Sequence, residues 1–212
     1  LQSRGDRNLD GEGAALLMRE LGIAATDIRS PRSLARWEKL AAAGRSHDRE
    51  GAIGDDDDVA RADAAAIPVP ADLEDDDRYG TVGAVGCDAD GAIWACTSTG
   101  GRGHEAVGRV SDSPTSAGNY ACPRVAISAT GFGEQIIDLN VCGRIATRML
   151  DGADLESALA RTFAEVEAFG GLLGVIAITA DGQAGYAHST EACGVAWRDA
   201  GGAVHVDRHG RG

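Results

Sequence analysis

Thr81 follows Gly80 at the start of a strand-like run, and the chemistry that a threonine could perform there depends on a free chain end. A threonine hydroxyl is a poor nucleophile unless a base takes its proton, and the α-amine of the same residue can be that base once the residue is N-terminal. This amine has a reference pKa of about 7.7 to 8.0, so roughly a tenth of it is free base at neutral pH. Gly80-Thr81 therefore suggests a self-cleaving bond, at which the Thr81 hydroxyl attacks the Gly80 carbonyl and an N-to-O acyl shift precedes scission.

Taken alone, a Gly-Thr pair is an ordinary entry to a strand, and three downstream segments change that interpretation. Residues 97–101 read TSTGG, residues 108–114 read GRVSDSP and residues 128–134 read SATGFGE. They add hydroxyls, a guanidinium, a carboxylate and glycine-rich backbone to the threonine. Each segment is weak by itself, and the ordered set predicts one site for N-terminal nucleophile chemistry.

The elements that must position these residues follow from periodicity and turn signals. Patterns of apolar residues predict helices at residues 12–21, 31–43, 133–150 and 155–169, the last capped by Asp154, and the first two as packed surface helices. Strands are predicted at residues 81–87, 92–99, 124–129, 172–179, 184–189 and 194–206, with a hairpin turn at 88–91 and a loop at 100–118. Residues 44–80, rich in Asp, predict an exposed acidic linker. This order favours a layered α+β core over a parallel α/β sheet.

Composition excludes several partners. The 212 residues carry a net charge of −13 and a pI of about 4.7, so electrostatics repel nucleic acid and anionic lipid, and we expect neither as a partner. No apolar run approaches the roughly 20 residues of a membrane span. Five cysteines form no CxxC pair and predict buried thiols in a reducing compartment, so we expect a cytoplasmic protein.

Other charged and histidine clusters carry weaker signals. The acidic runs at residues 55–58 and 75–77 lack the spacing, glycine and closing glutamate of an EF-hand and predict solvated linker. His205 and His209 lie in a strand and a terminal tail, and His104 is expected to be an exposed loop histidine. We expect no metal site among the residues of this sequence.

With these residues in place, the chain resembles the plant-type asparaginases, also called isoaspartyl aminopeptidases, of the N-terminal-nucleophile hydrolases, which are related to the glycosylasparaginases. The resemblance covers residues 81–190 and, more loosely, residues 12–43. It implies that Gly80 and Thr81 form the autocleavage site and that Thr81 is the nucleophile. Thr99 is similar to the family's second threonine, which holds the nucleophile's hydroxyl. Thr130 and Gly131 are similar to its oxyanion hole, made of one hydroxyl and one backbone N–H.

The same resemblance implies a binding site for the charged ends of an amino-acid substrate. Arg109 would grip an α-carboxylate and Asp112 an α-ammonium, for which a guanidinium fork and a carboxylate are suited. Gly133 would leave room for the ammonium near the backbone. Two positions depart from the family: Ser111 stands where glycine is usual, and Phe132 where a small or polar residue is usual. For Arg109 and Asp112 the alternative is a structural salt bridge within the loop.

The resemblance implies a four-layer αββα N-terminal-nucleophile sandwich, with the upstream part of the α chain missing from this sequence. Residues 1–80 would be the C-terminal part of an α subunit, including the acidic linker at about 44–80, and residues 81–212 a β subunit beginning at Thr81. It further implies a dimer of αβ heterodimers and no organic cofactor, with a structural sodium ion, if present, bound outside the visible sequence.

The expected activity is hydrolysis of the β-amide of L-asparagine, or of the β-aspartyl bond of isoaspartyl dipeptides, through an acyl-enzyme on Thr81. Two alternatives stay open. One keeps the fold and cleaves glycosylated asparagine. The other is a non-catalytic homologue that is never processed and serves as a binding partner.

Overall fold

The structure, a computed structural model, describes residues 9, 11–27, 31–42, 80–101 and 108–208. The chain divides into two compact units, residues 1–68 and 69–212. Apart from Gly80, the predicted linker lies outside the described residues, as do His104 and His209. Within the described part of the chain, no helix combines the length and the apolar character needed to cross a membrane.

The first unit contains the two helices predicted from the N-terminal sequence. They are α1 (Gly11–Glu20) and α2 (Pro31–Ala42). The prediction that both are packed surface helices is wrong for α1, because none of its residues is buried and its apolar stripe includes the exposed Leu16.

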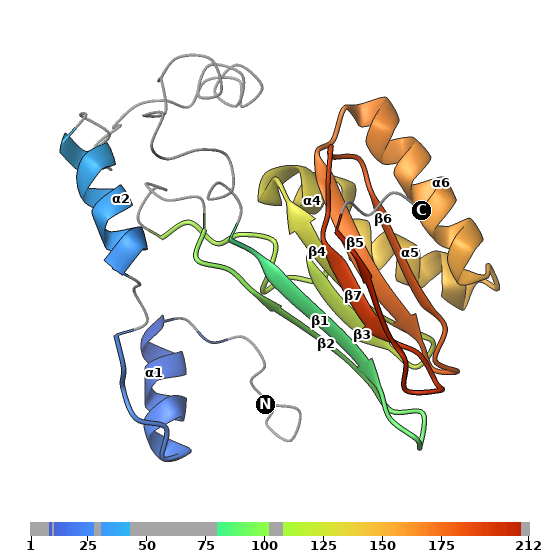
Figure 1. Ribbon diagram of the computed structural model, residues 1–212, viewed down its shortest axis with the longest axis horizontal. Coiled ribbons are helices and arrows are strands. Elements are labelled where there is room, and N and C mark those ends of the chain that lie inside the picture. Colours follow the sequence, from blue (N-terminus) through green and yellow to red (C-terminus); the bar gives the residue numbers. More distant parts are fainter. Residues whose placement is uncertain (1–8, 10, 28–30, 43–79, 102–107, 209–212) are drawn as a thin grey trace. The chain divides into compact units, whose positions relative to one another are not determined.

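The second unit is built on a four-stranded antiparallel sheet of order β3-β4-β5-β6 (Figure 1). Its strands are β3 (Asn119–Cys122), β4 (Val125–Gly131), β5 (Leu173–Thr179) and β6 (Ala184–His188). Strand β3 was not predicted, because its four residues follow directly on the glycine-rich loop. Strand β4 is central and buried along most of its length, so its C-terminal end at Thr130 and Gly131 is a well-fixed part of the fold.

Helices cover one face of this sheet (Figure 1). They are α4 (Gly133–Leu139), α5 (Val141–Leu150) and α6 (Leu155–Phe169). The core between helices and sheet is apolar, because alternate residues of β4 and β5 point to this side and meet the buried stripes of the helices. Its largest fully buried members are Ile127, Ile136, Ile145, Leu155, Leu173, Val125, Val141, Val166 and Val175. The Asp154 side chain accepts a hydrogen bond from Ser157 N at 2.8 Å, which confirms the predicted cap of α6.

The single helix predicted at residues 133–150 is wrong, because Asn140 divides it into α4 and α5. Asn140 adopts the left-handed conformation, with φ 45° and ψ 51°, and its backbone N–H closes α4 on Ile137 O at 2.9 Å. Asparagine tolerates this conformation better than most residues. The apolar periodicity runs through the break, which is why the sequence pattern did not reveal it.

A two-stranded hairpin lies on the opposite face of the sheet. It consists of β1 (Val82–Cys87) and β2 (Ile93–Ser98), which pair antiparallel and contact β4. Asp88 shapes the predicted turn, since its Oδ1 accepts from Asp90 N and Ala92 N at 3.0 and 2.9 Å. Thr97 Oγ1 and Ser128 Oγ share a hydrogen bond of 2.6 Å between the hairpin and β4. This bond sets the position of the hairpin on the sheet.

The last predicted strand, residues 194–206, is in fact a second hairpin. Strands β7 (Val195–Arg198) and β8 (Val204–Asp207) pair antiparallel, and Asp199 closes their turn by accepting from Ala203 N at 2.9 Å. The Trp197 ring lies 5.9 Å from the Tyr186 ring, whose hydroxyl donates to Asp207 Oδ2 at 2.9 Å. Tyr186 projects from the face of β6 away from the helices, so this hairpin lies on the same side as β1 and β2.

All five cysteines are free thiols, and the prediction that they are buried holds fully for Cys142 alone. Cys96 is exposed, because it points outward from the hairpin, and the other three are partly buried. Burial raises the pKa of the Cys142 thiol, and the charge of Asp112 raises it further. Cys142 therefore stays protonated and packs as an apolar side chain.

Helices α5 and α6 are joined by a polar network at their surface. Arg148 donates to Glu165 and to the buried Thr162, both at 2.5 Å, and Arg144 donates to the other Glu165 oxygen at 2.5 Å. Hydrogen bonds from Arg148 and Arg144 lower the pKa of Glu165 to about 2. The charged form of Glu165 is therefore favoured by folding.

We expect Glu165→Gln to lower the free energy of unfolding at pH 7 by about 1 kcal/mol, because solvent screens a carboxylate whose side chain is 42% exposed. The folded pKa lies below the unfolded value of 4.5, so the contribution is present above about pH 4.5 and is lost as pH falls toward 2. Urea unfolding from pH 7 to 3 measures the difference. Glu167→Gln is the matched control on the same helix, and a Glu165→Gln effect that stays constant over this pH range would contradict the assignment.

Candidate active site

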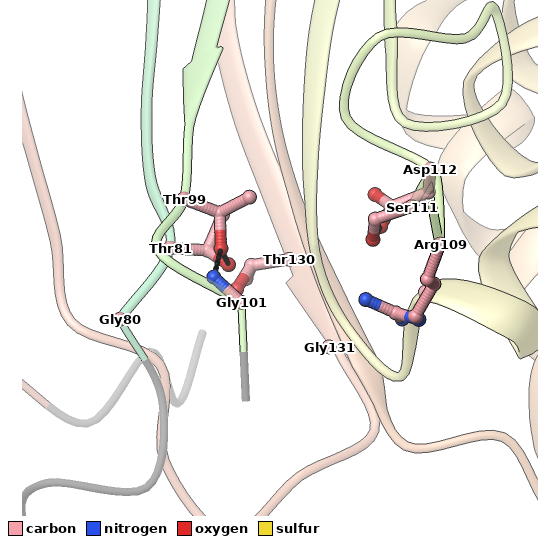
Figure 2. Close-up of a pocket in the computed structure, with 10 residues that line it drawn as sticks. Gly80, Thr81, Thr99, Gly101, Arg109, Ser111, Asp112, Thr130 and Gly131 are labelled. Atoms are coloured by element: carbon pink, nitrogen blue, oxygen red, sulfur yellow. Dashed lines mark hydrogen bonds between the residues drawn. The ribbon is translucent and has the colours of Figure 1, made fainter. Parts of the chain in front are cut away.

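One pocket of the second unit gathers all the residues that the sequence analysis selected (Figure 2). They come from five places in the chain: the start of β1, the end of β2, the loop before β3, the end of β4 and the start of α4. The lining residues are Gly80, Thr81, Thr99, Gly101, Arg109, Ser111, Asp112, Thr130, Gly131 and Gly133. Residues from Gly80 to Gly133 thus meet in one pocket, as the sequence analysis expected of these segments.

Thr81 and Thr99 lie side by side because antiparallel pairing places the start of β1 beside the end of β2. Thr81 Oγ1 donates to Thr99 Oγ1 at 3.1 Å, and Gly101 N donates to the same Thr99 oxygen at 3.1 Å. The backbone N–H of Gly101 thus fixes the Thr99 hydroxyl, which in turn orients the Thr81 hydroxyl. The sequence analysis identified both threonines but missed Gly101, whose contribution is a backbone group and leaves no residue-type signal.

Thr130 and Gly131 end the central strand β4 and face the two threonines across the pocket (Figure 2). Gly131 has a φ of 136°, a conformation that side chains other than glycine rarely adopt. A Cβ there would lie 2.5 Å from Leu172 O and 2.6 Å from Leu173 Cα. The close pairing of β4 with β5 therefore requires glycine at this position.

Charged groups occupy the other side of the pocket (Figure 2). Glu134 Oε1 accepts from Arg109 Nε at 2.7 Å and forms a salt bridge with Arg109 Nη2 at 2.6 Å. Asp112 is 5% exposed, and Ser111 Oγ donates to its Oδ1 at 2.7 Å. The guanidinium is thus oriented by a partner from α4. The sequence analysis quoted Glu134 within a motif without assigning it, because its contact with Arg109 spans 25 residues.

Phe132, which we expected to depart from the family pattern, is not among the residues that line the pocket. It is partly buried at the start of α4, and its backbone N–H donates to Leu172 O at 3.1 Å. The other departure, Ser111, does line the pocket. Of these two side chains, Ser111 is the one that lies in the pocket and could contact a ligand.

Among the described residues, no group of three or more His, Cys, Asp or Glu side chains could hold a metal ion. His205 instead pairs with Asp199 at 2.8 Å and stacks on Trp197. The pocket offers a hydroxyl pair beside a Gly-Thr bond, a hydroxyl and backbone at the end of β4, and one group of each charge. This set is suited to acyl transfer on a small zwitterionic amide.

Comparison with known proteins agrees with a site for acyl transfer on amides. A family model described as asparaginase matches residues 1–207, and the chain belongs to this asparaginase family. Its members with curated names are hydrolases of amides. The fold described here, with mixed helices and antiparallel sheets, is that of an N-terminal-nucleophile hydrolase.

The chain is similar to three bacterial relatives. It is 37% identical over 183 residues to an isoaspartyl peptidase/L-asparaginase of Nostoc, which covers 86% of this chain and 53% of the relative. A protein of the same name from Synechocystis is 36% identical, over 86% of this chain and 51% of the relative. The isoaspartyl peptidase of Escherichia coli is 42% identical over 62% of this chain and 42% of its own length. The chain thus spans about half the length of the curated relatives that it matches.

We expect Gly131→Ala to lower the free energy of unfolding by about 1 to 3 kcal/mol more than Gly152→Ala. Gly152 also has a positive φ, of 103°, but a Cβ there would meet nothing within 4 Å, so it reports the conformational cost alone. Urea unfolding of both variants measures the difference. Equal losses would show that the strand pairing at Gly131 relaxes to accept a side chain.

Proposed function

We propose that the full protein is an autoprocessing amidohydrolase that hydrolyses the β-amide of L-asparagine, the β-aspartyl bond of isoaspartyl dipeptides, or both. The observation that carries this proposal is the hydrogen bond between the Thr81 and Thr99 hydroxyls, directly after Gly80 and within one pocket with Arg109 and Asp112. The names of the relatives support the same substrates.

Maturation would use the same hydroxyl as catalysis. Thr81 Oγ attacks the Gly80 carbonyl carbon, the C–N bond breaks, and the Gly80 acyl group moves to oxygen while the Thr81 nitrogen becomes an amine. Water then hydrolyses this ester, which leaves a Gly80 carboxylate and a free Thr81 amino terminus. Thr99, whose Oγ1 accepts a hydrogen bond from the Thr81 hydroxyl, would hold that hydroxyl in place for this attack.

Hydrolysis would follow the same route with substrate in place of Gly80. The free α-amine takes the proton of the Thr81 hydroxyl, whose oxygen attacks the β-carbonyl carbon of the substrate. Thr130 Oγ1–H and the Gly131 N–H would stabilise the developing oxyanion, and such donors are each worth on the order of a hundredfold in rate. The amine returns the proton to the leaving nitrogen, which departs as ammonia or as a peptide amine. Water then releases aspartate from the β-aspartyl ester.

Arg109 and Asp112 would hold the two charged ends of the substrate. Arg109 is oriented by Glu134, which limits the freedom that its guanidinium loses on binding a carboxylate. Asp112 is buried, so its attraction for an ammonium is little screened by solvent.

The proposal extends to the assembly. The helices, the sheet and the two hairpins would be parts of a four-layer αββα sandwich in the full protein, in which residues 1–80 end the α chain and residues 81–212 form the β chain. The outward face of the first hairpin supports a further covering layer, since Val82 is 66% and Trp94 47% exposed. We further propose a dimer of αβ heterodimers that needs no organic cofactor. Five free thiols support function in the cytoplasm.

We expect Thr81→Ala to abolish both chain splitting after residue 80 and ammonia release from L-asparagine, because no hydroxyl remains to attack either carbonyl. Intact mass measures the first and an ammonia assay the second. Ser98→Ala, an exposed hydroxyl next to Thr99, is the control and should split and turn over normally. Splitting that persists in Thr81→Ala would refute the nucleophile, and an unsplit wild-type chain would favour the non-catalytic homologue.

Relative rates on three substrates decide between the proposed activities. We expect the matured protein to hydrolyse L-asparagine and a β-aspartyl dipeptide at least tenfold faster, by kcat/KM, than a glycosylated asparagine, because the relatives named above are peptidases and asparaginases. The opposite order would assign the site to glycosylasparagine.

A further inference from the structure

Ser111 is the feature of the pocket that the proposed chemistry does not use. It stands between Arg109 and Asp112 in the sequence and lines the pocket with them. Its hydroxyl points to the same oxygen of Asp112, Oδ1, that lies beside Gly133. The other carboxylate oxygen, Oδ2, lies against Gly118. Oδ1 is thus the pocket-facing oxygen, and Ser111 shares it.

Gly133 lets these groups approach the backbone closely. A Cβ built on Gly133 would lie 2.5 Å from Ser111 Oγ, 2.7 Å from Asp112 Oδ1 and 3.2 Å from Arg109 Nη2, so a side chain there would clash with them. Ser111 Oγ and Asp112 Oδ1 therefore lie next to each other at the start of α4, and the Arg109 guanidinium is nearby. Two of these atoms are oxygens and the third is a cationic nitrogen.

The chemistry of these atoms distinguishes the two ends of a zwitterion. Each N–H of an ammonium needs an acceptor, and a serine hydroxyl that donates its proton keeps two lone pairs to accept with. A hydroxyl that donates to a carboxylate is polarised and becomes a better acceptor. Ser111 Oγ can therefore accept from an ammonium while it donates to Asp112. The nearby guanidinium repels the ammonium and attracts the carboxylate.

We propose that Ser111 is a substrate-binding residue, whose hydroxyl oxygen accepts a hydrogen bond from the α-ammonium of the substrate beside Asp112 Oδ1. The inference rests on the proposed function for the identity of the ligand. A glycine at this position would leave Asp112 as the one side-chain acceptor of the pair. Ser111 thus makes the site more selective for a free α-amino group.

A purely structural Ser111 would act differently. It would stabilise the loop, and its loss would weaken both ligands or lower stability. A Ser111 that acts only by orienting Asp112 would have no effect once Asp112 is replaced, so Ser111→Ala added to Asp112→Asn should still weaken aspartate binding if the hydroxyl contacts the ammonium directly. A hydroxyl that contacts the ammonium discriminates between ligands that differ only in that group. L-aspartate, the proposed product, and succinate, which lacks its amino group, form such a pair.

The test is calorimetric titration of the full-length matured protein with L-aspartate and with succinate. We expect the wild type to prefer aspartate, and both Ser111→Gly and Ser111→Ala to reduce that preference about tenfold through weaker aspartate binding, since a hydrogen bond to a charged group is lost. Succinate binding should change less than about twofold. Ser116→Ala removes an exposed hydroxyl from the same loop and should leave both affinities unchanged. Thermal unfolding shows whether the variants are folded. Ser111→Ala is included because alanine, unlike glycine, does not add backbone freedom to the loop.

Each outcome has a separate meaning. An unchanged or increased preference for aspartate in both Ser111 variants overturns the inference, while turnover of L-asparagine by the wild type leaves the proposed function in place. A loss of preference in a protein that binds aspartate but hydrolyses no amide supports Ser111 and overturns the proposed activity. A wild type that binds neither ligand, or binds both equally, overturns the inference about the ammonium.

Discussion

The hydrogen bond of 2.6 Å between Thr97 Oγ1 and Ser128 Oγ ties the β1–β2 hairpin to the central strand β4, and the arrangement of the site depends on it. Ser128 is buried and Thr97 is half-buried, so each hydroxyl would be costly to bury without the other. Two residues further along each strand come Thr99 and Thr130. Because side chains alternate along a strand, fixing Thr97 against Ser128 also brings these two hydroxyls to the same side and the same end.

The two sides of the pocket differ in how firmly the fold holds them. Thr130 and Gly131 end a strand that is buried from Val125 to Ala129 and that packs against α4 and α5. Thr81 and Thr99 belong to a hairpin whose outer face is exposed. The proposed nucleophile thus lies on the more exposed layer and the proposed oxyanion site on the more buried one. Groups that stabilise a transition state act best when their positions need no rearrangement, so this division suits acyl transfer.

On the charged side of the pocket, burial and pairing orient the two groups that are proposed to bind the ends of a zwitterion. Asp112 is nearly inaccessible, and the Arg109 guanidinium is oriented by Glu134. The pairing of Arg109 with Glu134 could not be assigned from sequence spacing. Glu134 opens a helix that packs on the sheet, and it meets Arg109 because β4 and α4 turn back over the loop that carries the arginine. Ser111 contacts its sequence neighbour Asp112, yet its packing against the Gly133 backbone depends on the same turn of the chain.

The sequence by itself determined the residue types of the site, the two hairpin strands with their Asp88 turn, and the amphipathic helices α5 and α6, because these depend on local spacing and apolar periodicity. It misjudged residues 133–150 and 194–206, where apolar character continues through a left-handed Asn140 and through a turn closed by Asp199. Only the tertiary structure decided that Gly101 N donates to Thr99, that Glu134 holds Arg109, and that Ser111 lines the pocket while Phe132 does not. Such contacts are set by the packing of layers against each other, and a linear pattern carries no record of which faces will meet.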